Sequence, residues 1–177
     1  MPLTDLDLLD LIGDVLGLLD IDEFRVGLLL ALLAVLPSRL ALLTDVGLGP
    51  AVTLAEPRLA ASWLEKLARF AEESPLYQRL AATGDGRPIR LSDVETREEL
   101  EATNLFREVY SPLGLNHQIS FTLTYGARGV LTVVLSRGGR DYTNGERDFL
   151  DQARPYLTQA FRNACDYSYR GREPFLP

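Results

Sequence analysis

The sequence has one cysteine (Cys165), one histidine (His117) and one lysine (Lys66) among its 177 residues. A single cysteine cannot form an internal disulfide, so we expect a protein of a reducing compartment, the cytoplasm. One histidine and one cysteine are too few for a protein-built zinc site, and we therefore expect no metal centre and no cofactor. Phosphate-binding glycine loops, paired-cysteine motifs and a nucleophile elbow are also missing. A Cys165–His117 pair is the weak remaining enzyme alternative, and we expect no enzyme.

Long hydrophobic runs and an excess of basic residues are missing as well. The longest apolar run, Val26 to Leu36, has 11 residues, whereas a membrane helix needs about 20. The acidic N-terminus does not resemble a signal peptide, so no membrane association is expected. The net charge is −7, and residues 1–24 hold seven acids and no Lys or Arg, which leaves the remainder neutral. Such a balance repels a phosphate backbone, and we expect no direct contact of these residues with DNA.

An amphipathic helix is predicted over residues 4–19, with Thr4 as its N-cap and Asp7 completing a capping box. One stripe of this helix is apolar and consists of Leu8, Ile12, Val15 and Leu19. Further leucines (Leu6, Leu11, Leu18) widen the apolar surface beyond the need of one contact. Two interpretations stay open: the helix packs on its own core, or it also pairs with its copy, with Leu8, Ile12, Val15 and Leu19 as the dimer interface.

The remaining periodicities alternate between helices and strands along the chain. Helices are expected over 22–36, 57–70, 74–84, 96–110 and 143–165, and strands over 40–46, 51–54, 88–91, 117–124 and 130–135. The first two strands should form a hairpin, and 130–135 should be a central strand because it is continuously apolar. This order predicts an α+β domain with one central antiparallel sheet flanked by helices.

The strand at 117–124 alternates apolar and polar residues, and its parity places His117 with Ile119 and Phe121 on the interior face. A histidine there is either held by backbone groups or forms a hydrogen bond to a ligand between sheet and helices. Aromatic residues of neighbouring segments are either core or the wall of a small-molecule pocket. The candidate ligand-binding residues are Trp63, Tyr77, Phe106, Tyr110, His117 and Phe121.

Several short motifs, taken together in their order and spacing, resemble the sensory half of LuxR-type transcriptional regulators. The motifs are Thr96–Leu100, Glu108–Gly114, His117–Ile119, Leu135–Gly138, Glu146-Arg147, Arg154-Pro155 and Ala160–Ala164. The resemblance covers nearly the whole chain and is strongest over 93–164. It departs from the family pattern at Tyr156, where a histidine is expected, and by having no helix-turn-helix after Cys165.

The resemblance implies a GAF-like sensory domain that dimerises, responds to a small-molecule effector and contacts DNA only through a C-terminal helix-turn-helix domain. It implies a fold whose N- and C-terminal helices pack together. The chain then has three parts: a dimerisation helix (1–20), the GAF-like domain (21–165), and a tail or linker (166–177). The alternative is a stand-alone ligand-binding or protein-interaction module with no DNA-binding output. Reading the encoding gene beyond the codon for Pro177 distinguishes the two.

Overall fold

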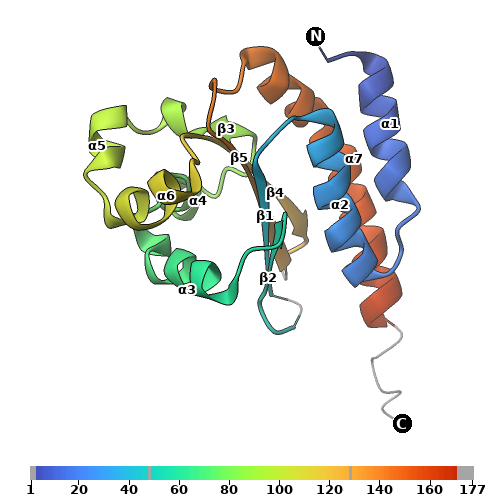
Figure 1. Cartoon of the computed structure of the whole chain (residues 1–177). Coiled ribbons are helices and arrows are strands. Elements are labelled where there is room, and N and C mark those ends of the chain that lie inside the picture. The colour runs from blue at the N-terminus through green and yellow to red at the C-terminus, as the bar shows by residue number, and fades with distance from the viewer. Residues whose placement is uncertain (1–2, 48, 128, 171–177) are drawn as a thin grey trace.

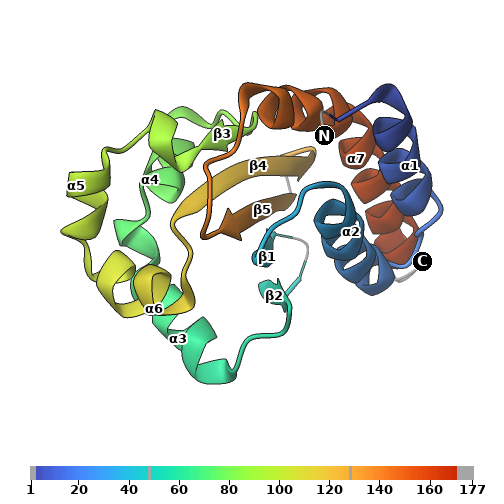
Figure 2. The same cartoon turned by 45° about the horizontal axis from the view of Figure 1, so that its top comes forward.

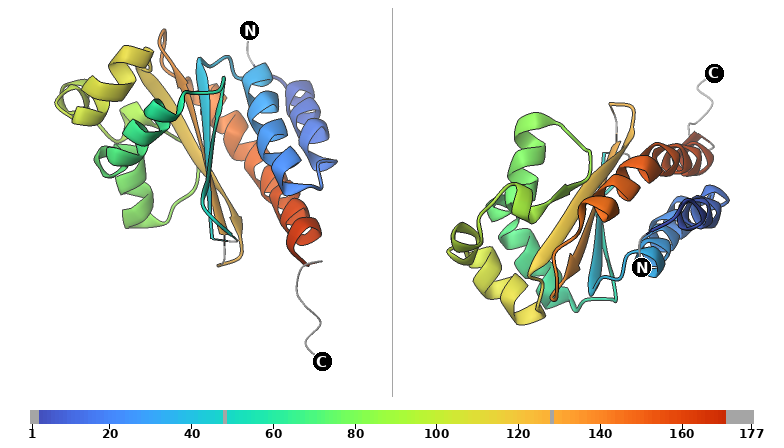
Figure 3. Two further views of the ribbon diagram at one scale, coloured as in Figure 1. Left: turned by 60° about the horizontal axis from the view of Figure 1, so that its bottom comes forward. Right: turned by 90° about the horizontal axis from the view of Figure 1, so that it is seen from above.

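A central sheet separates two unlike helical layers in the computed structural model, which describes residues 3–47, 49–127 and 129–170. Helices α3 to α6 cover one face of the sheet, and α2 and α7 cover the other (Figure 1). Helix α1 packs on α2 and α7 from outside, so it forms the outermost layer (Figure 3). The N- and C-terminal helices therefore pack together, as the sequence predicts.

The sheet has the strand order β2-β1-β5-β4-β3, and all its neighbouring strands are antiparallel. Its strands are β1 (Leu40–Val46), β2 (Val52–Glu56), β3 (Ile89–Arg90), β4 (His117–Tyr125) and β5 (Gly129–Arg137). The predicted hairpin of β1 and β2 is confirmed. The apolar strand β5 lies in the centre, between β1 and β4. The α+β class with one antiparallel sheet is thus confirmed.

The helices begin largely where the capping signals in the sequence place them. They are α1 (Asp5–Leu16), α2 (Ile21–Val35), α3 (Ala61–Arg69), α4 (Pro75–Thr83), α5 (Arg97–Glu101), α6 (Ser111–Leu113) and α7 (Asn144–Arg170), with single turns η1 (Ala71–Glu73), η2 (Leu91–Asp93) and η3 (Phe106–Tyr110). Thr4 and Asp7 form the expected capping box at α1, and Asp20 caps α2. Short polar side chains that accept from free backbone N–H groups explain these starts.

The single helix expected over 96–110 is instead divided into α5 and the π-helical turn η3. The hydroxyl of Thr103 donates to the carbonyl oxygen of Leu100 and accepts from the N–H of Phe106. This side chain replaces backbone partners and restarts the helix. Propensity alone does not reveal such a break.

Helix α7 continues to Arg170, past the expected end at Cys165. Its last turns are held against the body of the domain, because the hydroxyl of Ser168 accepts from the backbone N–H of Ile21 at 2.9 Å. The expected boundary between residues 165 and 166 thus falls inside a helix. Residues 171–177 of the predicted tail lie outside the described part.

Two buried residues of the predicted dimer stripe belong to the subunit's own core. Ile12 and Val15 are buried, and Leu19 is exposed. Val15 belongs to the core shared with α2 and α7, and Leu8 is half-buried against that core. Ile12 and Val15 thus agree with a helix packed on its own core, while pairing of the helix with its copy stays a prediction. The apolar side chains that α1 leaves on the surface are different ones, on its opposite face.

Candidate functional site

Three of the predicted ligand-binding residues lie together between the sheet and the layer of α3 to α6. Phe106 and Tyr110 of η3 are buried there, and Trp63 of α3 is half-buried against the same cluster. Figure 2 shows this layer on the side of the sheet opposite to α2 and α7. The rest of the buried cluster is aliphatic: Leu40, Leu76, Leu91, Leu100, Leu105, Val109 and Leu115.

The other three predicted residues do not join this group. Phe121 is 1% exposed but belongs to the core shared with α2 and α7, on the opposite face of the sheet. Tyr77 on α4 is 53% exposed. His117 is half-buried at the start of β4, where its Nδ1 lies 3.7 Å from a carboxylate oxygen of Asp141. The grouping of all six in one pocket is therefore wrong, because the parity that sends Phe121 inward sends it to the other core.

A row of buried polar side chains forms the sheet surface beneath the aromatic cluster. Gln118, Ser120 and Thr122 alternate with the apolar positions of β4, and they are 2%, 7% and 3% exposed. Ser136 of β5 is paired with Gln118 across the strands and is also buried. We call these four residues the polar floor. Sequence alternation alone suggests that such residues face solvent, whereas here the second helical layer covers them.

Tyr110 connects this helical layer to the polar floor. Burial raises the pKa of the Tyr110 hydroxyl, while hydrogen bonds with Gln118 and Ser74 act to lower it. The phenol therefore stays protonated at neutral pH, and its oxygen can both donate and accept a hydrogen bond. Within the described residues, no buried side-chain nitrogen or oxygen lacks a hydrogen-bond partner.

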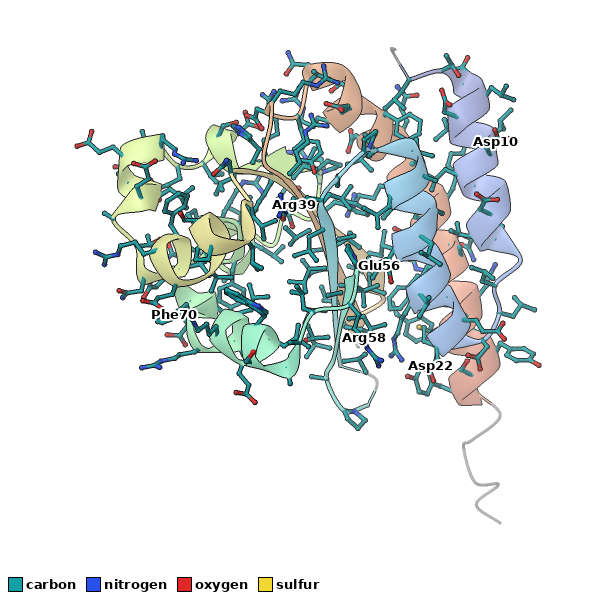
Figure 4. The ribbon with its side chains drawn as sticks, in the orientation of Figure 1. Asp10, Asp22, Arg39, Glu56, Arg58 and Phe70 are labelled. Carbon is teal, nitrogen blue, oxygen red and sulfur yellow. The ribbon has the colours of Figure 1, made fainter. Side chains whose placement is uncertain are left out.

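Helix α3 covers the floor less tightly than the other long helices cover their cores. None of its residues is buried, and its apolar side chains Trp63 and Leu67 are only half-buried. Phe70, labelled in Figure 4 in the layer opposite α1, extends this half-buried wall beyond the end of α3. Lys66 contacts Glu108 at 3.4 Å and lies 5.2 Å from the centre of the Trp63 ring. Both Lys66 and Glu108 are substantially exposed, and such an ion pair holds the helix only weakly.

The chemistry of this site suits binding of a neutral molecule. The floor offers hydroxyl and amide groups, and the wall offers aromatic and aliphatic surface, a combination typical of small-molecule sites.

The thiol of Cys165 lies on the other face of the sheet, where burial raises its pKa to about 12. Among the described residues, no group of three or more His, Cys, Asp or Glu side chains is placed to hold a metal ion. None of the helices in the described segments is long and apolar enough to cross a membrane.

A surface hollow of about 790 Å³ lies elsewhere, where the N-termini of α1 and α7 meet the end of α2. Its acidic lining residues include Asp7 and Glu146, and both are occupied as helix caps. Glu146 also forms two hydrogen bonds with Arg137, at 2.9 and 2.8 Å. These acids are explained by helix starts and an ion pair, so this hollow adds nothing to the site.

No family model matches the sequence, and no curated protein matches it either. Solved structures do match. The ligand-binding domain of VqsR from Pseudomonas aeruginosa superposes with a TM-score of 0.70 at 13% identity, over 89% of this chain and 96% of that one. CepR2 from Burkholderia cenocepacia, an N-acylhomoserine lactone dependent LuxR family transcription factor, gives 0.63 at 15% identity, over 89% and 93%.

SdiA in complex with octanoyl-rac-glycerol gives a TM-score of 0.64 at 13% identity, over 93% of this chain and 68% of that one. A GAF domain/HD domain protein from Geobacter sulfurreducens is similar at a TM-score of 0.55 and 16% identity, over 85% and 95%. At these identities the likeness establishes the fold alone. The chain has the GAF-like fold of the ligand-binding domains of LuxR-type regulators.

Proposed function

We propose that this chain is the sensory domain of a LuxR-type transcriptional regulator and binds a small neutral amphiphile between its sheet and the layer of α3 to α6. The observation that carries the proposal is the polar floor, which is buried beneath a half-buried aromatic and aliphatic wall. A polar head group would exchange hydrogen bonds with Ser120, Gln118 and Tyr110. Its apolar chain would lie against Trp63 and neighbouring aliphatic side chains.

Two lines of support come from outside the site chemistry. CepR2, which shares this fold, depends on an N-acylhomoserine lactone, and SdiA shares it in a complex with octanoyl-rac-glycerol. Both compounds are uncharged and join a polar head to an acyl chain. A site without an unpaired charged side chain suits such molecules better than it suits anions, because burying an unpaired charge is costly.

Fluorescence provides the test, because Trp63 is the single tryptophan of the chain and lies in the proposed wall. We expect titration with N-octanoyl homoserine lactone or octanoyl-glycerol to shift Trp63 emission to shorter wavelength, as ligand displaces water from the indole. Ser120→Ala should weaken binding by about tenfold, the value of one hydrogen bond. The matched control is Cys165→Ala, a buried change of similar size on the opposite face of the sheet, and it should leave the affinity unchanged.

An unchanged emission with both compounds, together with no thermal stabilisation, would contradict this ligand class. Equal loss of affinity in Ser120→Ala and Cys165→Ala would show that the floor has no direct part. A shift that persists in Ser120→Ala at the original affinity would place the ligand elsewhere.

The proposal extends to the mode of action of the domain. We propose that it acts by binding and not by catalysis, in the cytoplasm, as a homodimer whose geometry changes with the ligand. The alternative is a stand-alone module with no DNA-binding output. Sequencing of the gene beyond Pro177 separates the two, because a continuing frame with a helix-turn-helix pattern supports the regulator and a stop codon supports the module.

A further inference from the structure

Four threonines lie side by side on the face of the sheet that carries the polar floor. They are paired across neighbouring strands in the order Thr53 (β2), Thr44 (β1), Thr132 (β5) and Thr122 (β4). Directly opposite residues of antiparallel strands point to the same side of a sheet, and Thr122 belongs to the polar floor, so all four share its face. Because neighbouring strands are about 5 Å apart, the side chains repeat at that distance. We call these four residues the threonine row.

The threonine row passes from the surface into the polar floor. Thr53 is exposed, Thr44 and Thr132 are half-buried, and Thr122 is 3% exposed. The exposed end lies at the sheet edge formed by β2, whereas Thr122 lies toward the edge formed by β3 (Figure 2). The row thus connects solvent at the β2 edge with the buried floor.

Gly86 closes the buried end of the row. Its carbonyl oxygen accepts from the backbone N–H of Thr122 at 3.0 Å, and a Cβ at Gly86 would collide with the hydroxyl oxygen of Thr122. Glycine allows the backbone to approach this hydroxyl so closely. The row therefore has one closed end and one accessible end, which is the shape of a site that a molecule enters from one side.

Uncharged side chains surround the row on this face of the sheet. The two adjacent rows consist of Ser120, Val134, Leu42 and Ala55 on one side and Thr124, Val130 and Val46 on the other. Hydroxyl groups thus lie between two largely aliphatic rows. An ionised phosphate or carboxylate would find no counter-charge among these side chains, and its desolvation would be costly. The row therefore suits an uncharged head group.

The hydroxyls of the row favour a ligand that itself carries hydroxyls. Each threonine hydroxyl has one donor and two acceptor positions, so a hydroxyl that donates to its neighbour in the row still accepts. A lactone ring only accepts, and it would leave these acceptor positions to water. An alcohol group donates and accepts at once, and two of them on neighbouring carbon atoms can contact two threonines of the row.

The acyl chain of such a ligand has an apolar path from the row to Trp63. Val134 and Ala55 of the adjacent row pack against the same buried cluster as Trp63. Ser120 lies in that adjacent row as well, paired with Val134. A head group at Ser120 and a chain at Trp63, as in the proposed function, are therefore compatible with further head-group contacts to Thr132.

We propose that the ligand is an acylated polyol, whose head group carries two or more hydroxyls and binds Thr44 and Thr132 of the threonine row beside Ser120. The inference rests on the proposed function and names the class of its ligand. A neutral ester of a polyhydric alcohol fits both the hydroxyls of the row and the apolar path. A lactone lacks the hydroxyls, and an anion lacks the counter-charge.

Calorimetric titration of the full chain with two compounds of equal acyl length tests this class. Octanoyl-glycerol carries two free hydroxyls, whereas N-octanoyl homoserine lactone carries none. We expect octanoyl-glycerol to bind at least about tenfold more tightly, the value of one additional hydrogen bond. Equal affinities, or tighter binding of the lactone, would overturn the polyol class.

A valine variant tests the row itself, because valine keeps the β-branched shape of threonine and removes only the hydroxyl. Thr132→Val should weaken binding of octanoyl-glycerol by about tenfold and change the affinity for the lactone by less than about twofold. Thr124→Val is the matched control, since Thr124 is half-buried on the same face but lies outside the row. It should leave both affinities unchanged. Equal losses for both compounds in Thr132→Val would assign Thr132 to structure and overturn the row.

The outcomes separate this inference from the proposed function. Failure of both compounds to bind would overturn the two proposals together. Binding of both compounds without preference would overturn the polyol class and leave the proposed function standing. Weaker binding of both compounds in Ser120→Ala, combined with weaker binding of octanoyl-glycerol alone in Thr132→Val, would support both proposals.

Discussion

The two faces of the sheet carry different kinds of side chain. The face toward α2 and α7 is packed with large apolar side chains, among them the stacked rings of Phe24 and Phe161, 5.9 Å apart. The face toward α3 to α6 has a polar floor, and the helix α3 above it has no buried residue. Close apolar packing provides stability, whereas a satisfied polar surface under a loosely packed wall can exchange partners. The first face therefore provides stability, and under the proposed function the second face exchanges ligand.

The largest expected effect comes from a ring in the face toward α2 and α7. Phe161→Ala should reduce the free energy of unfolding by about 3–5 kcal/mol, because it leaves a cavity in a dense core. Trp63→Ala in the other layer should cost only about 1 kcal/mol, since the indole is half-buried. Urea unfolding monitored by circular dichroism measures both. Equal losses of unfolding free energy in the two variants would contradict a larger contribution of the face toward α2 and α7 to stability.

A buried ion pair in the same face gives the next largest effect. Arg25 donates from Nε and Nη2 to one carboxylate oxygen of Asp45 at 2.9 and 2.6 Å, and both side chains are buried. Asp45→Asn should cost about 3–4 kcal/mol, because it leaves the guanidinium without its buried counter-charge.

Asp22 offers a matched control for Asp45. It contacts the same guanidinium at 2.6 Å, but its side chain is 82% exposed. Asp22→Asn should therefore change the stability by less than about 0.5 kcal/mol. If both variants lose the same amount, burial does not set the value of these contacts.

Acid should weaken the ion pair that joins β5 to the start of α7. Burial acts to raise the pKa of Glu146, but hydrogen bonds from Arg137 and Thr143 outweigh it and hold the pKa at about 2. Because this folded-state pKa lies below the ordinary value of 4.5, the pair contributes fully above about pH 4.5 and the contribution is lost as the pH falls toward 2. The loss should be roughly 3 kcal/mol.

Urea unfolding at a series of pH values tests this contribution, with Glu146→Gln as the reference. The difference in stability between the original protein and Glu146→Gln should shrink as the pH falls from 4.5 to 2. A constant difference over that range would contradict the depressed pKa, because other acids titrate equally in both proteins.

A small effect on stability is also expected for the polar floor. Ser136→Ala should change the free energy of unfolding by no more than about 1 kcal/mol, the net value of a hydrogen bond. Thermal unfolding with and without N-octanoyl homoserine lactone should nevertheless show a reduced stabilisation by the ligand. A variant that loses stability but keeps the full ligand effect would assign Ser136 to structure alone.

The fold was largely predictable from periodicity and capping, and the site was not. Alternation in β4, continuous apolar residues in β5 and the cap at Thr4 are local signals, and the structure follows them. The same alternation gives no sign that Ser120 is covered by a helix distant in sequence. Parity likewise placed Phe121 inward without telling which of two cores it joins, so the candidate pocket mixed two faces of one sheet.

The α1 helix shows a similar limit. Its periodicity predicted an apolar surface wider than one contact needs, and the structure has apolar side chains on two different sides of the helix. Which side of α1 is buried depends on where α2 and α7 lie, and the positions of these helices are known only from the fold. Ile12 and Val15, which are candidates for a dimer interface in the sequence, are buried in the subunit, whereas Leu6 and Leu9 are exposed.

Hydrogen exchange of the full chain with and without N-octanoyl homoserine lactone tests the central assignment most directly. The account predicts slower amide exchange in α3 to α6 and in β4 when the ligand is present, with little change in α2. Protection confined to α2 and α7, or no protection at saturating ligand, would contradict the assignment of ligand exchange to the polar floor.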